Sequence, residues 1–470
     1  MAKKILLVNP PSAFDVYKNS KVRAAVPRLP VMSLAMLASV LLKEGAEVKI
    51  LDLAVEPDHL SSLGKAVKDF LPDFVGITAT TPLFFEAASV ARTIRGIKND
   101  AVLIAGGAHP SALPEECLKT SDFDIIVIGE GEETLKEIVR GDRWAGIRGV
   151  AFREDGKIVM TPEREITGNL DDLPVPALQL FDLSRYSCPR MISRRNPVGP
   201  LEMSRGCVFR CSYCNKNISG RTFRIKSPER VIEEIAHLRR LGFREFHVLD
   251  DQFSTDIKKA KEICRAIIRS GIGMPWNLRT GVRVDRIDEE FLDLARRAGC
   301  YQVGVGFESG SQASLDAIGK GIDLTQAFKA SGMIRRAGLE CVGFFMLGLP
   351  TDTADTLEET INFAIRLDPD YAKATILVPF PGTVIFDEFE KKGLIKTRDW
   401  RKYNFHNASE IYVHPNLDWM TLNRYYNKFH RRFYLRSNYI FRHFFRSLFR
   451  GRLIDDLISA FKTFSIGGQF

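Results

Sequence analysis

Short apolar segments alternate with segments of helical spacing along most of this chain, and no other feature limits its fold as strongly. Before residue 146 the expected strands are residues 4–9, 47–52, 74–79, 102–106 and 124–128. Strands that alternate with helices of about 10–15 residues indicate βαβ units and a parallel sheet. Residues 1–145 therefore predict a doubly wound α/β domain, which binds ligands at the carboxyl ends of its strands.

A second run of the same alternation covers residues 201–395. Its expected strands are residues 201–204, 245–249, 276–279, 302–307, 339–347 and 373–379. Six βα units without an obvious seventh or eighth predict a partial (β/α)6 barrel. Ser227, Asp288 and Asp355 are expected to cap helices of this region. Between the two runs, residues 146–200 hold an expected hairpin and then a proline-rich linker.

The composition excludes several classes of protein. The 470 residues are 45% hydrophobic and 27% charged, which is ordinary for a soluble globular protein. No apolar run approaches the ~20 residues of a membrane-spanning helix, and the N-terminal apolar stretch is too short for a signal peptide. A cytoplasmic location is therefore expected. Five of the eight cysteines occur singly and are expected to be buried free thiols; these are Cys117, Cys188, Cys264, Cys300 and Cys341.

The other three cysteines lie close together after the first expected barrel strand. Cys207, Cys211 and Cys214 have the spacing Cys-x3-Cys-x2-Cys. Three thiolates on one loop can bind three irons of a [4Fe–4S] cluster and leave the fourth iron without a protein ligand. An open metal position is typical of catalytic sites. The alternatives are a structural zinc site, for which no fourth ligand follows nearby, and incidental free cysteines.

The segment from Met203 to Cys214, with the strands around it, resembles the cobalamin-binding subgroup of the radical S-adenosylmethionine (SAM) superfamily. This subgroup is related to the anaerobic magnesium-protoporphyrin ester cyclase and to class B radical SAM methyltransferases. The resemblance implies an α/β protein with a Rossmann-like cobalamin-binding domain in residues 1–145 and a TIM-type radical SAM barrel in residues 201–395. A helical extension would follow in residues 396–470. SAM would bind at the open iron.

The resemblance also implies SAM contacts at the ends of the barrel strands. The residues concerned are Asp250 and Asp251 for the methionine amine, Arg279 and Arg283 for its carboxylate, Glu308 and Ser309 for the ribose, and Gly343 and Gly348 for the adenine. Carboxylates suit an ammonium, guanidinium groups suit a carboxylate, and glycines allow close backbone approach. Each residue has a structural alternative, such as a helix cap, a turn or a solvated surface charge.

Cobalamin contacts are implied in the loops that follow the strands of the first domain. The residues concerned are Pro10, Thr80, Gly106, Gly107, His109, Gly129 and Glu130. Neither a Gly-x-Gly-x-x-Gly turn nor a Walker-type loop is present, which argues against a dinucleotide or ATP site. The Asp-x-His-x-x-Gly motif of many cobalamin domains is missing, so no lower histidine ligand to cobalt is evident. A domain that had lost cobalamin would look similar, and His109 could equally be a satisfied loop histidine.

The C-terminal segment is aromatic, basic and helical in pattern. Residues 421–470 contain ten Lys or Arg and two Asp, which accounts for +8 of the net charge of +9. The apolar residues with helical spacing are Phe441, Phe445, Leu448, Ile454, Leu457, Ile458 and Phe461, with Arg442, Arg446, Arg450 and Arg452 among them. This pattern indicates peripheral membrane contact or a lid for a lipid-like substrate. The alternative is a helix that packs its aromatics on the barrel, with its arginines outside. Nothing else in the chain supports nucleic-acid binding.

The resulting hypothesis is a cobalamin-dependent radical SAM methyltransferase. Its 5′-deoxyadenosyl radical would activate an unreactive carbon of a small-molecule substrate, and methylcobalamin would supply the methyl group. A one-electron reductant of the flavodoxin or ferredoxin type is implied as partner. Two alternatives remain: radical oxidation, cyclisation or carbon–carbon bond formation on a lipid or tetrapyrrole, and a non-catalytic cobalamin sensor or carrier. The sequence expectation for location is cytoplasmic, with membrane association left open by the C-terminal segment.

Overall fold

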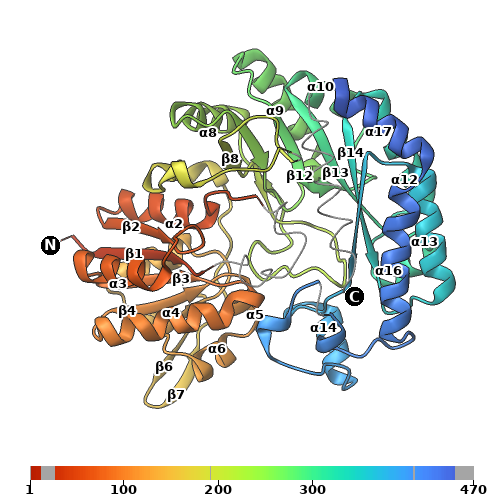
Figure 1. Ribbon diagram of the computed structural model, residues 1–470. Coiled ribbons are helices and arrows are strands. Elements are labelled where there is room, and N and C mark those ends of the chain that lie inside the picture. Colours follow the sequence, from red (N-terminus) through yellow and green to blue (C-terminus); the bar gives the residue numbers. More distant parts are fainter. Residues whose placement is uncertain (1, 12–26, 191, 406–407, 450–470) are drawn as a thin grey trace.

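The computed structural model describes residues 2–11, 27–190, 192–405 and 408–449. Two mainly parallel sheets lie side by side, and loops fill the centre between them (Figure 1). Helices cover both faces of the first sheet and the outer side of the second (Figure 1). The first sheet belongs to the N-terminal third of the chain and the second to the barrel. No helix in these ranges combines the length and the apolar composition that a membrane crossing requires.

The first sheet has seven strands in the order β2-β1-β3-β4-β5-β6-β7. The strands are β1 (Lys4–Asn9), β2 (Glu47–Asp52), β3 (Phe74–Thr78), β4 (Val102–Gly106), β5 (Ile125–Val127), β6 (Val150–Glu154) and β7 (Lys157–Met160). The helices are α2 (Met32–Lys43), α3 (His59–Phe70), α4 (Phe84–Ile97), α5 (Ala108–Ala112), α6 (Pro114–Thr120) and α7 (Glu132–Arg140). The first five strands are parallel, which confirms the doubly wound domain. The strand order reverses between β1 and β3, and such a reversal is where sheets of this order bind ligands.

The expected hairpin forms, but it belongs to the first sheet rather than to a separate linker. Asp155 and Gly156 make its turn with φ of +48° and +75°. Strand β6 pairs antiparallel with β5, so that Ala151 lies opposite Ile126. The structural unit that holds the first sheet therefore extends to Met160, beyond the predicted boundary at residue 145.

The second sheet is the predicted six-stranded partial barrel. Its strands run parallel in the order β15-β14-β13-β12-β11-β8. They are β8 (Val198–Leu201), β11 (Glu245–Val248), β12 (Trp276–Val282), β13 (Cys300–Glu308), β14 (Glu340–Leu347) and β15 (Tyr371–Ile376). Helices α8 (Pro228–Arg240), α9 (Ile257–Ser270), α10 (Glu289–Arg297), α12 (Leu324–Arg336) and α13 (Ala354–Leu367) cover the outside of this sheet (Figure 1).

Two of the three predicted helix caps are confirmed. The Ser227 side chain accepts from Arg230 N, and the Asp288 side chain accepts from Phe291 N. Asp355 was expected to start α13, but it lies inside the first turn of this helix. Thr353 is the cap instead, because its hydroxyl and that of Thr356 bond each other's backbone amides in a capping box.

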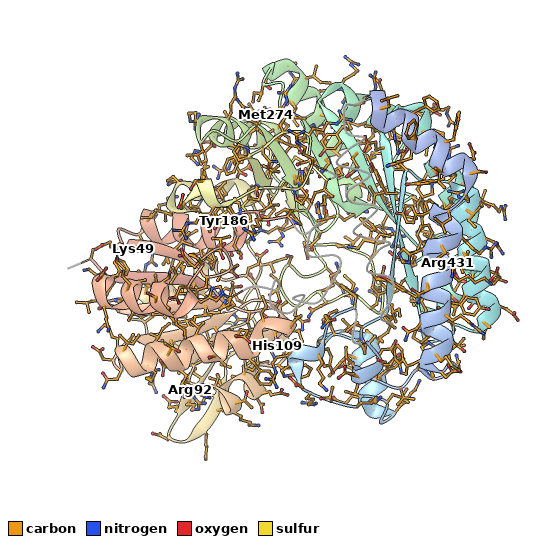
Figure 2. The ribbon with its side chains drawn as sticks, viewed as in Figure 1. Lys49, Arg92, His109, Tyr186, Met274 and Arg431 are labelled. Carbon is orange, nitrogen blue, oxygen red and sulfur yellow. The ribbon has the colours of Figure 1, made fainter. Side chains whose placement is uncertain are left out.

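Helix α16 (Trp419–Tyr434) covers the last strand of the barrel. The Tyr434 hydroxyl donates to the carbonyl of Ala372 at 2.8 Å and accepts from its amide at 3.1 Å, so it satisfies part of the edge of β15. Phe429 packs on Phe345 of β14 with ring centroids 5.3 Å apart. Arg431 is exposed on this helix (Figure 2). For α16, the expectation of aromatics packed on the barrel with arginines outside is therefore confirmed.

Helix α17 (Ser437–Phe449) has the opposite orientation. Arg442 pairs with Asp368, and Arg446 pairs with Asp370, both in the segment that leads into β15. The apolar residues on the other side of the helix are exposed; they are Ile440, Phe441, Phe444, Phe445 and Leu448. The expected packing of these aromatics on the barrel is thus wrong for α17. Ile454, Leu457, Ile458, Phe461, Arg450 and Arg452 lie outside the described residues.

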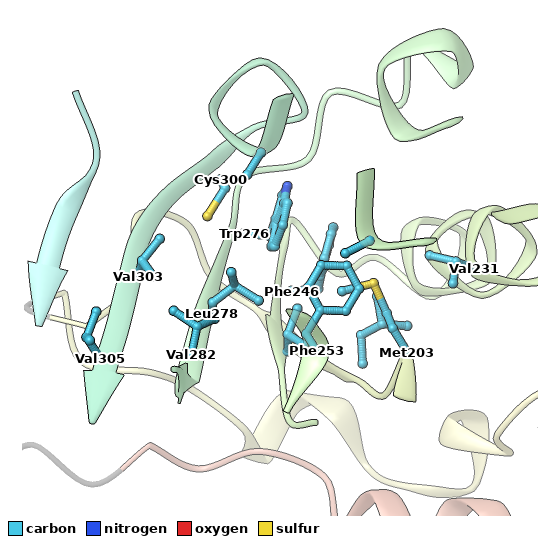
Figure 3. Close-up of a cluster of buried hydrophobic side chains, with 14 of the residues drawn as sticks. Met203, Val231, Phe246, Phe253, Trp276, Leu278, Val282, Cys300, Val303 and Val305 are labelled. Atoms are coloured by element: carbon cyan, nitrogen blue, oxygen red, sulfur yellow. The ribbon is translucent and has the colours of Figure 1, made fainter. Parts of the chain in front are cut away.

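Strand alternation separates the two faces of the barrel wall. Phe246 of β11 stacks on Trp276 of β12, with centroids 5.7 Å apart, in the apolar cluster on the outer side of the sheet (Figure 3). Glu245 and His247 alternate with Phe246, so they face the barrel interior. There the Glu245 carboxylate accepts from the Tyr301 hydroxyl at 2.7 Å and lies 2.9 Å from His247 Nε2. The barrel interior is therefore polar at this level.

Candidate functional site

The three clustered cysteines lie on a loop whose base is closed by a short antiparallel ribbon. Strands β9 (Ser204–Arg205) and β10 (Arg224–Ile225) form this ribbon, and residues 206–223 form the loop. Gly206 has φ of +81°, and a Cβ atom there would lie 2.1 Å from the carbonyl oxygen of Thr222. Only glycine fits this close approach. We call residues 206–223 the cysteine loop.

The thiols of the cysteine loop share one electrostatic environment. Burial raises the pKa of Cys214, the Lys216 ammonium opposes this rise, and the charges of Cys211 and Cys207 add to it. Within the described ranges, no group of three His, Cys, Asp or Glu side chains is arranged around a single metal ion. In a cubane cluster each thiolate binds a different iron, so the sulfurs need not converge on one point. The loop therefore supplies three thiolates, the number that a [4Fe–4S] cluster with one open iron requires.

Asp250 and Asp251 secure the start of the cysteine loop from the end of β11. The Asp250 carboxylate is buried and accepts from Met203 N at 2.7 Å and from Ser204 Oγ at 2.6 Å. Asp251 accepts from Gly206 N at 2.9 Å. Both oxygens of Asp250 are thus used by the protein, which differs from the expected contact with the methionine amine. For Asp251, which keeps one oxygen, that contact remains a prediction.

The burial of Asp250 predicts a pH dependence of stability. Burial raises the pKa of this carboxyl to about 7, whereas in an unfolded chain its pKa is near the ordinary value of 3.8. Between these values the folded state binds the extra proton, so the free energy of unfolding falls as the pH rises, by at most about 1.4 kcal/mol per pH unit. Urea unfolding of the wild type and of Asp250→Asn from pH 5 to pH 8 measures this. We expect their difference in stability to fall up to about pH 7; a constant difference would contradict the assignment.

Arg283 holds the cysteine loop from the other side. Its guanidinium stacks on Phe209, with 3.6 Å between Cζ and the ring centroid. Its Nε pairs with Asp285 at 2.9 Å, and its Nη1 donates to the carbonyl of Lys320 at 2.7 Å. Arg283 is buried and occupied by these partners. This placement indicates that Arg283 supports the cysteine loop. The geometry does not favour the expected contact with the SAM carboxylate.

Glu308 connects the cysteine loop to the end of β13. Its Oε1 accepts from the Tyr213 hydroxyl at 3.0 Å and from the Lys320 ammonium at 2.8 Å. Glu308 has φ of +62°, an uncommon conformation for a residue with a side chain, and such strain often occurs at functional sites. Its Oε2 makes no hydrogen bond within the described ranges. This oxygen is in a position consistent with the predicted ribose contact.

Ser309, Gly343 and Gly348 face away from this centre. The Ser309 hydroxyl is buried, lies 3.1 Å from Thr360 Oγ1 and accepts from Ser311 N, so a ribose contact through it is not favoured. A Cβ atom at Gly343 would come within 2.9 Å of the Phe345 ring on the outer side of the sheet. The missing side chain at Gly343 therefore serves packing. Gly348 has φ of +76° and faces the C-terminal extension at Leu422.

In the first domain, Pro10 and Thr80 follow β1 and β3 and so flank the point where the strand order reverses. Gly106 ends β4, beside the same edge. Gly107 has φ of +110°, and a Cβ atom there would lie 2.7 Å from the carbonyl oxygen of Ala79. The loops after β3 and β4 are thus packed tightly together. This edge remains the predicted place for a large ligand.

His109 and Glu130 are both packed against protein groups, although His109 Nε2 has no hydrogen-bond partner among the described residues. His109 is fully buried between the rings of Phe84 and Trp400, at 4.6 Å and 5.0 Å, and burial lowers its pKa to about 3 (Figure 2). It is therefore a core histidine. Glu130 accepts from both terminal nitrogens of Arg224, at 2.9 Å and 2.8 Å, and is itself nearly buried. A cobalamin contact through either side chain is not favoured by this packing.

The pair of Glu130 and Arg224 joins the two domains at their functional edges. Arg224 belongs to the ribbon under the cysteine loop, and Glu130 follows β5 of the first sheet. A Cβ atom at Gly129 would lie 3.7 Å from the carbonyl oxygen of Asn217 in the cysteine loop. Arg205, two residues before Cys207, pairs with Glu132 at 2.8 Å. The carboxyl ends of the first sheet therefore face the cysteine loop directly.

Sequence reasoning missed three residues of this centre, namely Tyr213, Lys216 and Lys320. Tyr213 and Lys216 lie within the cysteine loop, so their position beside Cys214 was a usable signal. Lys320 is far along the chain from the loop, and its contact with Glu308 depends on the path between β13 and α12. No pattern in the sequence indicated it.

Comparison with known proteins agrees with this architecture. The model of the radical SAM superfamily matches residues 201–364, and that of the B12 binding domain matches residues 22–139. The solved structure of the radical SAM methyltransferase TsrM from Kitasatospora setae, with cobalamin and a [4Fe–4S] cluster bound, has a TM-score of 0.69 to this chain at 23% identity. It covers 83% of this chain and 75% of that one, and it shows the shared fold.

Two curated relatives are similar over most of their length. An uncharacterized methyltransferase of Pyrococcus horikoshii is 36% identical over 408 residues, which are 85% of this chain and 86% of that protein. The anaerobic magnesium-protoporphyrin IX monomethyl ester cyclase of Rubrivivax gelatinosus is 30% identical over 377 residues, which are 77% of this chain and 67% of that protein. With the cysteine loop and the two domains in place, the chain belongs to the cobalamin-binding radical SAM family of enzymes, whose cofactors are a [4Fe–4S] cluster, SAM and cobalamin.

Proposed function

We propose that this enzyme transfers a methyl group to an unactivated carbon of a small molecule. The observation that carries the proposal is the direct contact between the carboxyl ends of the first sheet and the cysteine loop, through Glu130 and Arg224. When bound, the cluster and SAM supply a carbon radical for hydrogen abstraction, and cobalamin carries the methyl group. Their two sites need to face one substrate, as these two edges do.

The chain's own residues hold this arrangement rigid. Cys207, Cys211 and Cys214 would hold the cluster, and Asp250 fixes the backbone at the start of their loop. The Tyr213 hydroxyl donates to Glu308 and so connects the cysteine loop to the end of β13. The cluster and a ribose bound by Glu308 would then stay at a constant distance from each other. Fixed groups around a reactive centre favour one geometry for the reaction and exclude side reactions.

The names of the relatives support methyl transfer over the alternatives. The Pyrococcus horikoshii protein is named a methyltransferase, and so is the cytidylyl-2-hydroxyethylphosphonate methyltransferase of Streptomyces wedmorensis, which is 29% identical over 84% of this chain. The Rubrivivax gelatinosus relative is a cyclase, which keeps radical cyclisation or oxidation as the second candidate. A non-catalytic cobalamin carrier is disfavoured by the complete cysteine triplet.

The test is product analysis after anaerobic reconstitution with iron, sulfide and hydroxocobalamin. A one-electron reductant is required, and we propose a protein of the flavodoxin or ferredoxin type. With SAM and reductant, methyl transfer predicts both 5′-deoxyadenosine and S-adenosylhomocysteine, the second only when cobalamin is present. Formation of 5′-deoxyadenosine alone, whether or not cobalamin is bound, would favour oxidation or cyclisation.

We propose further that α17 contacts a membrane surface, from which a lipid-like substrate would enter. Five exposed apolar residues, from Ile440 to Leu448, lie on one side of this helix. Arg442 and Arg446 are turned to the barrel, so the helix presents aromatic rather than charged side chains to its surroundings. Aromatic and aliphatic side chains on one face of an interfacial helix insert into the headgroup region.

Replacing Phe441 and Phe445 together by aspartate is expected to abolish co-sedimentation with liposomes that contain anionic lipid. Two charges on the inserted face oppose burial in the bilayer surface. The side chains of Phe441 and Phe445 are 67% and 39% exposed, so their replacement should leave the fold intact. The matched control is Leu60→Asp on α3, another exposed apolar residue. Equal sedimentation of the double variant and the wild type would remove the membrane proposal.

A further inference from the structure

The interior of the barrel is not filled by side chains near its last two strands. On β15, Ala372 and Ala374 are buried against the outer helices, whereas Lys373, which alternates with them, is exposed. On β14, Phe345 is buried on the outer side, and Phe344 on the inner side is only partly buried. In a filled barrel the inward side chains are the buried ones. Solvent therefore reaches the inner face of this wall.

Arg279 faces the same interior from the opposite part of the sheet. Arg279 follows Leu278, which belongs to the outer apolar cluster, so its side chain lies on the inner face of β12, as that of Asn277 does. The Asn277 amide donates to the Tyr301 hydroxyl at 2.9 Å, inside the barrel. Partial desolvation by the barrel wall lowers the pKa of Lys373 although solvent reaches this side chain, and the charge of Arg279 lowers it further, which agrees with both cations facing the same interior.

One aromatic ring lies between these two cations. Phe344 is paired directly with Lys373 in the register of β14 and β15. A Cβ atom at Gly304 would lie 2.8 Å from the Phe344 ring and 3.1 Å from the carbonyl oxygen of Arg279. The ring thus extends from β14 over Gly304 to the backbone of β12. Arg279 and Lys373 therefore border a single apolar surface.

Neither cation has an acidic partner of its own. Within residues 2–11, 27–190, 192–405 and 408–449, the side chains of Arg279 and Lys373 make no hydrogen bond or ion pair. The nearby carboxylate of Glu245 is already used, since Oε1 bonds the Tyr301 hydroxyl and Oε2 accepts from Arg194 N and Arg195 N. Two cations that face one interior without a counter-charge repel each other, and an anion between them would offset this repulsion.

We propose that Arg279 and Lys373 bind an anionic group, a carboxylate or phosphate, of the substrate, with its apolar part against Phe344. This inference rests on the proposed function and names the substrate as an acidic small molecule. A guanidinium and an ammonium that face one interior from two strands suit such a group through charge-assisted hydrogen bonds. The sequence had suggested Arg279 for the carboxylate of SAM.

The surroundings of Arg279 favour the substrate over SAM. Arg279 lies on the same inner face as Asn277, whose amide donates to the Tyr301 hydroxyl in the buried network around Glu245. The cysteine loop contains a cation of its own, Lys216, two residues after Cys214. SAM is tied to the cluster through its methionine end, so its carboxylate belongs near the cysteine loop.

The test uses inorganic phosphate as probe and the reconstituted holoenzyme without turnover. Saturable broadening of the phosphorus-31 resonance measures its dissociation constant. We expect Arg279→Gln and Lys373→Met each to weaken binding by at least tenfold, with Arg279→Lys weakening it less. Arg240→Gln and Lys329→Met, exposed on α8 and α12, are matched controls and should bind as the wild type does. Unchanged cluster absorption and circular dichroism exclude misfolding.

A second arm separates the two sources of the anion. Equilibrium dialysis with labelled SAM should give the same affinity, within twofold, for wild type, Arg279→Gln and Lys373→Met. A tenfold loss of SAM affinity, with phosphate displaced by SAM, would assign the pair to SAM and overturn the inference. Absence of saturable phosphate binding in the wild type, or binding that both substitutions leave unchanged, would overturn it as well. Phosphate binding that persists without any methyl transfer would refute only the proposed function.

Discussion

Cys211→Ala is expected to lose the cluster and with it all SAM cleavage. Alanine removes one of three protein ligands, and the cofactor supplies the whole of the radical chemistry. Formation of 5′-deoxyadenosine should therefore fall by at least about three orders of magnitude, which corresponds to roughly 4 kcal/mol of activation free energy. Iron and sulfide content, visible absorption and product analysis measure the two effects together.

The matched control for this substitution is Cys117→Ala. Cys117 is fully buried in α6 of the first domain, where burial raises the pKa of its thiol, so it is a core cysteine without access to iron. This variant should keep its cluster and its activity. A Cys211→Ala protein with normal iron content, or a Cys117→Ala protein without iron, would contradict the assignment of the cysteine loop.

Arg224→Ala is expected to destabilise the contact between the domains by about 3–5 kcal/mol, because it leaves the carboxylate of Glu130 buried with its main partner removed. Glu130 accepts two hydrogen bonds from Arg224, whose other contacts are the carbonyl oxygens of Thr167 and Ser219. Urea unfolding measures the loss. We further expect methyl transfer to cobalamin to decline more than 5′-deoxyadenosine formation, since the pair aligns the first domain with the cysteine loop.

The control for Arg224→Ala is Lys119→Ala, which breaks the exposed pair of Lys119 with Glu115 on α6. Exposed pairs of this kind contribute less than about 1 kcal/mol. Equal stability of the two variants would show that the buried pair does not hold the domains together.

Most of the fold could be predicted from the sequence because both sheets are built mainly of parallel strands with strong apolar patterns. Strands β1, β2 and β4 have the predicted bounds, and five of the six barrel strands overlap their predicted ranges closely. The first barrel strand was predicted at residues 201–204 but lies three residues earlier, at Val198–Leu201. The hairpin was placed in the linker because its pattern shows two strands but not their partner, β5. The orientation of α17 was missed for a similar reason. Arg442 and Arg446 pair with Asp368 and Asp370, which lie 74 and 76 residues earlier in the chain.

The site was less predictable than the fold. The spacing of Cys207, Cys211 and Cys214 identifies their loop because their chemistry depends on local sequence. The family resemblance assigned Asp250 and Arg283 to SAM. Asp250 instead bonds Met203 and Ser204, just before the cysteine loop, and Arg283 stacks on Phe209 within it. A charged residue near a site can either bind a ligand or hold the loop that does. Only its contacts separate these roles.

The most direct test of the account follows the methyl group itself. Anaerobic enzyme, reconstituted with its cluster and hydroxocobalamin, is given SAM with a deuterated methyl group and reductant, and the corrinoid is examined by mass spectrometry. Methyl transfer through cobalamin predicts deuterated methyl on the enzyme-bound corrinoid, with S-adenosylhomocysteine in equal amount. A corrinoid that binds without acquiring the labelled methyl, while 5′-deoxyadenosine still forms, would contradict it.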